Sequence, residues 1–288
     1  MLVHKFLLDS SPETASQDTS PLYSRLPYEL RSIIFEYALI TCDESTEPGN
    51  KSHISINLLL TCRLVYLETC LLPVKLNKLV NWCYHQSQDD AFGLLSRLFK
   101  MCPEQRAAVQ SMHLFTQQSW LETGWLDLVK WPTVNPQTIR LTLRYSDWRS
   151  WEDYIYLCLD PKQAGRPVKS AVKKSAENPF EDGSWGQAFT HLHGLRTFYL
   201  ELETLFAKKE ELDRIVARAP TWQFVLGDGN VLLLDDKGTL RKEWVAPPRR
   251  DMQQTSTPHP GKQRIQPHYL LSILSSTSSP SPNLLRLF

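Results

Sequence analysis

Two N-terminal segments of this chain repeat their apolar residues at three- and four-residue spacing, which predicts two amphipathic helices. The first begins at Leu26 and Pro27, where proline suits the first turn because its φ is already near the helical value. Its main apolar stripe consists of Leu30, Ile33, Ile34, Tyr37 and Ala38. Phe35 and Leu39 lie off that stripe, so the helix has more apolar surface than one neighbour can bury.

The second segment runs from Ile56 to Leu72, and we expect Pro73 to end its helix. A polar stretch, 43–53, separates the two segments and contains the turn signal Pro-Gly-Asn. The N-terminal part of the chain is therefore expected to be a small helical unit.

From about residue 74 onward, strand-like and helix-like periodicities alternate. The clearest period-two pattern is 138–145, where apolar residues alternate with Thr138, Arg140, Thr142 and Arg144. The other predicted strands are a short one within 74–84, then 111–115, 195–202, 222–226, 231–235 and 239–245. One predicted helix begins near Asp89. The others cover 103–109, 120–129, 148–159, one or two turns in 184–190, and 207–219.

The strands near 112, 141, 198 and 224 each follow a helix and a polar turn, which is the order of a parallel sheet with helices along it. We therefore predict the α/β class, with α+β as the alternative. The body is either a compact α/β layer or a strongly degenerate leucine-rich-repeat solenoid, because the spacings are uneven. The last three strands are separated by glycine turns and are expected to form a meander.

Two polar tails flank these elements. Residues 10–21 and the chain from Pro247 onward are rich in serine, threonine, proline and glutamine, so we expect no regular structure there. The resulting division is a tail over 1–22, a helical module over 23–77, an α/β body over 78–246 and a second tail over 247–288.

Composition narrows the class of protein. An apolar fraction of 42% is typical of globular chains, and a net charge of +1 argues against general binding of nucleic acids. None of the six cysteines forms a Cys-x-x-Cys pair, which favours free thiols in a reducing compartment. The apolar run at 1–8 is too short for a secretory signal, and no run is long enough to cross a bilayer. We expect a cytoplasmic or nuclear protein with no membrane partner.

Candidate catalytic and metal-binding residues are few. The nucleophile, phosphate-loop and zinc-protease motifs are absent, so we predict neither an enzyme nor a cofactor. His191 and His193 could place two imidazoles together, but a third zinc ligand is missing and ordinary loop histidines are favoured. Asp228, Asp235 and Asp236 flank glycines, which turn chemistry explains better than a cation site.

Two clusters have both a functional and a structural interpretation. Tryptophans gather at Trp120, Trp125, Trp131, Trp148 and Trp151. They could form a recognition surface, but core filling is favoured. Basic residues in 162–174 could form an import signal or a nucleic-acid patch, and a solvated loop is favoured because the chain is nearly neutral.

The N-terminal residues resemble a known family. The pattern Leu-Pro-x-Glu-Leu-Arg-x-x-Ile-Phe-x-x-Ala-Leu, followed by Leu-Leu-x-Thr-Cys-Arg-x-Val-Tyr-x-Glu, is similar to F-box-like proteins of filamentous fungi over about residues 24–77. The resemblance implies a three-helix module that docks onto the small adaptor subunit of a cullin–RING ubiquitin ligase. It also implies a C-terminal region, often built of repeats, that holds a protein substrate.

The first hypothesis is therefore a ubiquitin ligase substrate adaptor, in which the α/β body binds the substrate. The residues that would dock onto the ligase adaptor are Leu26, Pro27, Leu30, Ile33 and Ile34. The alternative is a non-catalytic protein-interaction scaffold that does not bind the ligase adaptor, in which the helical unit only caps the body.

Overall fold

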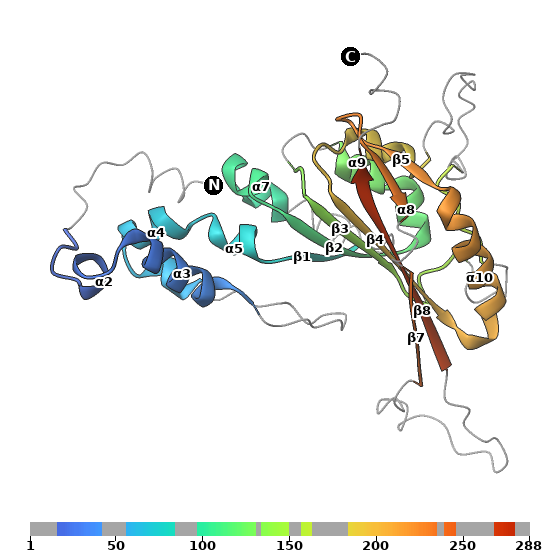
Figure 1. Ribbon diagram of the computed structural model, residues 1–288, viewed down its shortest axis with the longest axis horizontal. Coiled ribbons are helices and arrows are strands. Elements are labelled where there is room, and N and C mark those ends of the chain that lie inside the picture. The colour runs from blue at the N-terminus through green and yellow to red at the C-terminus, as the bar shows by residue number, and fades with distance from the viewer. Residues whose placement is uncertain are drawn as a thin grey trace, which may run out of the picture.

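The structure is a computed structural model of the chain that describes residues 16–41, 56–83, 97–130, 134–149, 157–162, 184–234, 239–245 and 268–279. Its centre is an eight-stranded sheet with the order β1-β2-β3-β4-β8-β6-β5, in which β7 also pairs with β8 (Figure 1). The strands are β1 (Leu79–Cys83), β2 (Ser111–Thr116), β3 (Thr138–Leu143), β4 (Thr197–Leu205), β5 (Gln223–Val225), β6 (Val231–Leu234), β7 (Leu240–Val245) and β8 (His268–Ser279).

The first four strands are parallel, and helical segments connect them. These are α7 (Pro103–Ala107) between β1 and β2, α8 (Gln118–Thr123) and α9 (Trp125–Val129) between β2 and β3, and η3 (Gln187–His191) between β3 and β4. After β4 come η4 (Phe206–Lys208), α10 (Lys209–Arg218) and η5 (Ala219–Thr221). The predicted α/β class is confirmed by this mixture of helices with a parallel sheet.

The side chains of each parallel strand alternate between the two faces of the sheet, and paired residues form rows across the strands. Leu141 of β3 pairs with Leu114 of β2 and with Leu200 of β4, and all three side chains are buried. Successive residues of a strand point to opposite faces, so Arg140 and Thr142 belong to the other face. The period-two prediction for this segment is confirmed.

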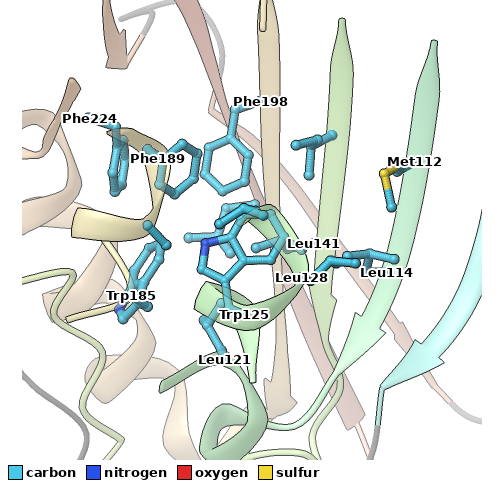
Figure 2. Close-up of a cluster of buried hydrophobic side chains, with 14 of the residues drawn as sticks. Met112, Leu114, Leu121, Trp125, Leu128, Leu141, Trp185, Phe189, Phe198 and Phe224 are labelled. Carbon is cyan, nitrogen blue, oxygen red and sulfur yellow. The ribbon is translucent and has the colours of Figure 1, made fainter. Parts of the chain in front are cut away.

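Aromatic side chains fill the core between the helices and the sheet face that carries Leu114, Leu141 and Leu200. Trp125 of α9, Phe189 of η3, Phe198 of β4 and Phe224 of β5 converge there with Trp185 (Figure 2). The Phe189 and Phe224 ring centroids are 4.5 Å apart, and those of Phe189 and Phe198 are 4.9 Å apart in an edge-on arrangement. Aromatic pairs at these separations add to the free energy of area burial.

The tryptophan cluster is part of this packing. Trp120, Trp125 and Trp148 are all buried, which confirms core filling for these three. The indole N–H of Trp148 donates to the carbonyl of Glu203 at 2.7 Å, whereas the buried N–H of Trp125 has no hydrogen-bond partner. Trp131 and Trp151 lie outside the described residues.

The N-terminal helices differ from the predicted pair. They are α2 (Pro21–Ser24), α3 (Tyr28–Leu39), η1 (Asn57–Leu60), α4 (Arg63–Thr69) and α5 (Leu72–Leu76). The prediction of one helix over 56–72 ended by Pro73 was wrong. Cys62 is extended and starts α4, and Pro73 lies in the first turn of α5, where its missing N–H is not needed.

The segments after the parallel strands required two further corrections. The predicted meander holds for β5 and β6, which are antiparallel neighbours, but β7 pairs with β8 and not with β6. The tail from Pro247 was expected to lack structure, yet 268–279 form β8 between β4 and β6. Backbone hydrogen bonds to distant strands are available to any non-proline residue, so polar composition did not exclude a strand. The strand near 224 is likewise antiparallel and not part of the parallel set.

Other predicted segments have mixed outcomes. The helix over 207–219 is confirmed by α10 and by burial of Leu212 and Ile215, and the short helix after Pro103 is confirmed by α7. The helix beginning near Asp89 lies largely outside the described residues, although 97–100 are helical. For the predicted helix over 148–159, residues 150–156 lie outside the described residues, and the described residues on either side are not helical.

Replacing Leu141 by alanine should lower the free energy of unfolding by about 2–5 kcal/mol, because it leaves a cavity at the centre of the sheet. Leu233→Ala on β6 is the matched control, since Leu233 is 41% exposed and Leu141 is 0% exposed. Urea unfolding of the full chain measures both. Equal losses in the two variants would contradict the assigned core.

Candidate functional site

The most exposed apolar region of the described chain lies on α3 and just after it. We define the α3 apolar surface as the exposed residues Tyr28, Leu30, Ile33, Ile34, Tyr37 and Ile40. Ile33 and Ile34 are close to half exposed, at 49% and 46%, and Tyr37 is 80% exposed. Large apolar side chains that remain accessible at helical spacing are typical of a protein-binding surface.

The buried side of α3 is the one that the sequence pattern placed off the main stripe. Phe35 and Leu39 are both almost completely buried. The helix therefore packs onto its own chain through these two residues and leaves the predicted stripe outward. Spacing shows which residues share a face, but it does not show which of two apolar faces will be covered.

The five predicted docking residues lie at the start of α3. Leu26 is half-buried, and Pro27 is the exposed N-cap residue of the helix. Leu30, Ile33 and Ile34 follow within its first two turns and are exposed. The structure thus brings four exposed residues onto one short stretch, and Leu26 at its start is half-buried.

Arg31 fixes the position of this surface. Its Nη1 donates to the carbonyl of Leu26 at 2.8 Å, and its Nη2 contacts Glu68 of α4 at 3.1 Å. Its guanidinium also stands 4.6 Å from the ring centroid of Tyr23 in α2. A single half-buried cation therefore links three helical segments, through charge-assisted hydrogen bonds and a cation–π contact. Burial, with the nearby charge of Glu68, raises the pKa of Tyr23 to about 12.

Asn77 connects the end of α3 to the beginning of the sheet. Its Nδ2 donates to the carbonyls of Leu39 and Pro73, both at 2.8 Å. Its Oδ1 accepts from the backbone N–H of Thr41 at 2.7 Å and from the Thr41 hydroxyl at 2.9 Å. This buried amide satisfies helix-end carbonyls that would otherwise be desolvated without partners. Because β1 begins two residues later, Asn77 couples the N-terminal helices to the α/β body.

A second group of polar side chains lies on the sheet face opposite the aromatic core. We call it the sheet-face network: His113 of β2, Arg140 and Thr142 of β3, and Glu201 of β4. Thr142 Oγ1 donates to Glu201 Oε2 at 2.6 Å and lies 2.9 Å from His113 Nε2. Arg140 Nη1 contacts Glu201 Oε1 at 2.8 Å. Both carboxylate oxygens are therefore satisfied, as a buried charge requires.

Aromatic rings and arginines extend this network on both sides. Trp82 and Phe115 stack with centroids 4.0 Å apart, and the Arg144 guanidinium lies 4.5 Å from the Trp82 centroid. At the other end, Arg140 lies 4.9 Å from the ring centroid of Tyr199. The resulting band of aromatic and arginine side chains crosses β1 to β4, and its residue types are those enriched at protein interfaces.

The network lacks the geometry of a nucleophile triad. A catalytic hydroxyl needs a base whose other nitrogen is oriented by an acid. Here Glu201 binds the Thr142 hydroxyl directly, and its Oε2 is 3.9 Å from the same His113 nitrogen, Nε2, that faces Thr142. The arrangement holds the Glu201 carboxylate through the Thr142 hydroxyl and the Arg140 guanidinium.

The pKa values of two acidic side chains, Asp147 just after β3 and Glu203 near the end of β4, are raised. Burial raises the pKa of Asp147 to about 6, although the backbone N–H of Arg144 donates to its Oδ2 at 3.0 Å. Burial also raises the pKa of Glu203, and the charge of Arg144 opposes that rise. A charged carboxylate in this position is therefore disfavoured by desolvation.

The metal hypotheses have the following outcome. His191 and His193 are both exposed, and the described part of the chain contains no group of three or more metal-ligating side chains. Asp228 stabilises a turn: its carboxylate accepts hydrogen bonds from the backbone N–H of Gly194 at 2.8 Å and of Asn230 at 3.1 Å. Burial raises the pKa of Asp228, but these hydrogen bonds outweigh it and hold the pKa below its ordinary value. Asp235 and Asp236 lie outside the described residues, as does most of the basic segment 162–174.

The cysteines that the structure describes are free thiols, as predicted: Cys62, Cys70, Cys83, Cys102 and Cys158. Burial raises the pKa of Cys83 to about 12, which keeps this thiol protonated and unreactive.

Comparison with protein-family models, with curated proteins and with solved structures gave no match to this chain. Among the described residues, none of the helices is both long and apolar enough to cross a membrane.

Sequence reasoning did not identify the sheet-face network. Its only signal was the alternation that placed Arg140 and Thr142 on one side of a strand, with Glu201 in a second predicted strand. Which of these residues are neighbours depends on the pairing of β2, β3 and β4, and one-dimensional periodicity does not contain that register.

Asp147 should make stability depend on pH. Its pKa is higher in the folded chain than its ordinary value of 3.8, so the folded state is favoured below that value and loses stability as pH rises toward about 6. Asp147→Asn keeps an acceptor for the Arg144 N–H and removes the ionisation. The variant should therefore reduce the stability loss between pH 4 and pH 7 by up to about 3 kcal/mol.

Urea unfolding at both pH values measures this difference, with Asp213→Asn on α10 as the control for an exposed carboxylate. Glu203 and Arg144 remain in both variants, but the charge of Asp147 helps to raise the pKa of Glu203, so Asp147→Asn removes that part of the pH dependence as well. An unchanged pH dependence in Asp147→Asn would show that the buried carboxyl is not the titrating group.

Proposed function

We propose that this chain is an F-box-like substrate adaptor. In this function the α3 apolar surface binds the small adaptor subunit of a cullin–RING ubiquitin ligase, and the α/β body binds a protein substrate. The observation that supports the proposal is that Leu30, Ile33 and Ile34 stay exposed on the helix that begins with the F-box-like Leu-Pro pattern.

The exposed area is large enough to contribute to binding. Fully burying an isoleucine or leucine side chain is worth about 1.5–3 kcal/mol, so a half-exposed one retains about 1 kcal/mol for a partner. The α3 apolar surface has six large side chains at one helix, which suits a helical partner that covers an i, i+3, i+4 pattern. The rigid placement of this surface by Arg31 reduces the ordering cost of association.

Two features support a separate substrate site on the body. The N-terminal helices project away from the sheet (Figure 1), so a partner on α3 leaves the body accessible. The aromatic and arginine residues beside the sheet-face network are of the kinds that dominate binding energy at protein interfaces. Neither feature requires a catalytic group on this chain.

The alternative function is a protein-interaction scaffold that does not contact the ligase. It would be favoured if later segments of the chain covered the docking residues. Pro27 and Ile34 are exposed, while Leu26 is half-buried, so the cover that the scaffold predicts is absent from most of the α3 apolar surface in the described structure.

Substituting Ile34 by glutamate should weaken binding of the purified full chain to the ligase adaptor by at least about tenfold, because a charge replaces a partly buried apolar contact. Leu233→Glu on β6 is the matched control, since its exposure is similar and it lies in the sheet. Isothermal calorimetry measures affinity, and thermal unfolding verifies that both variants are folded.

If the unmodified chain forms no complex with the ligase adaptor at micromolar concentration, the ligase function is wrong and the scaffold function is favoured. Equal weakening by both substitutions would show that binding does not use the α3 apolar surface.

A further inference from the structure

The α3 apolar surface is bordered by acidic side chains. Glu29 and Glu36 are both exposed on α3, and a separation of seven residues places them on the same side of the helix. Arg31 is the one basic residue of α3, and it is partly buried and paired with Glu68. The exposed part of α3 is therefore apolar and acidic, so a segment that fits it combines apolar residues with a basic one.

The apolar run at residues 1–8 of the same chain has this composition. Its sequence is Met-Leu-Val-His-Lys-Phe-Leu-Leu, which contains a lysine and no acidic residue. Four of its apolar residues have the spacing that brings side chains to one side of a helix, namely Leu2, Val3, Phe6 and Leu7. Neither the sheet nor the proposed docking through α3 assigns a role to this run.

The length of chain between this run and α3 is sufficient for the two to meet. The described chain starts at Ser16 and enters α2, which lies beside α3, because the Arg31 guanidinium is 4.6 Å from the Tyr23 ring centroid (Figure 1). The chain from Leu8 to Ser16 can span up to about 28 Å. The helix that it has to reach has 12 residues and is therefore about 18 Å long.

A weak contact is enough when the two segments belong to one chain. A short linker gives an effective concentration of about 1 mM, so a contact with a dissociation constant of about 1 mM would be formed in half of the molecules. Mutual burial of apolar residues from the run and from the α3 apolar surface needs to supply only that affinity. An apolar segment laid against a helix face is an established mode of peptide recognition.

We propose that residues 1–8 bind the α3 apolar surface of the same chain, with their apolar residues against α3 and Lys5 beside its acidic residues. The segment then covers the docking residues until a partner displaces it, so it is an internal competitor of that partner. The contact itself does not depend on the identity of the partner. Only the competition with the ligase adaptor rests on the proposed function, so the two are tested separately.

Photo-crosslinking in the full chain tests the contact. With p-benzoylphenylalanine in place of Phe6, mass spectrometry should identify cross-links to residues 28–40 within the same chain. Ile34→Glu should reduce their yield at least about fivefold, because it places a charge in the apolar surface, whereas Leu233→Glu on β6 should leave the yield unchanged. Mixing isotopically labelled and unlabelled copies distinguishes cross-links within a chain from those between chains. The absence of cross-links to 28–40, cross-links formed only between copies, or a yield unaffected by Ile34→Glu would each overturn the proposal.

Binding of the full chain to the ligase adaptor tests the competition. Phe6→Glu should raise the affinity at least about twofold, because a cover formed in half of the molecules halves the fraction that is competent to bind. Thr14→Glu is the control for a charge added outside the run and should leave the affinity unchanged. Equal affinities of the unmodified chain and Phe6→Glu, measured by calorimetry, would overturn the competition. If the ligase adaptor binds none of these chains, the proposed function is wrong, and the cross-links still decide whether residues 1–8 contact α3.

Discussion

Hydrogen bonding of β3 to β2 on one side and to β4 on the other is the constraint on which the rest of the body depends. This parallel register brings Leu114, Leu141 and Leu200 into one buried row. The same register brings His113, Thr142 and Glu201 together on the opposite face. The aromatic core and the sheet-face network are therefore two results of one pairing, and a slip of one residue would remove both.

The N-terminal helices are attached by a small number of polar contacts. Arg31 connects α2, α3 and α4, and Asn77 connects the end of α3 to α5 and the start of β1. Only Phe35 and Leu39 bury the inner side of α3. Because two polar residues hold the helix in place, its outer stripe does not need to pack against the body. Leu30, Ile33 and Ile34 therefore remain accessible on the outer side of α3.

The two candidate binding regions differ in how they are specified. The α3 apolar surface is a property of one helix and is contained within a few turns of sequence. The sheet-face network is a property of the whole sheet, because it exists only when β2, β3 and β4 are paired. Local sequence can specify the first kind of surface, whereas the second depends on pairings between strands far apart in the chain.

The sequence by itself determined the α/β class, the strands near 112, 141 and 198, helix α10 and the surplus apolar surface of α3, because each depends on a period of 2 or 3.6 residues. Tertiary structure alone decided which face of α3 is covered. It also decided that 268–279 form a strand, and that His113, Thr142 and Glu201 meet. In each of these cases the deciding energy comes from a partner distant in sequence: burial of Phe35 and Leu39, or hydrogen bonds between strands. A pattern read along the chain contains the period of each element but not the identity of its neighbour.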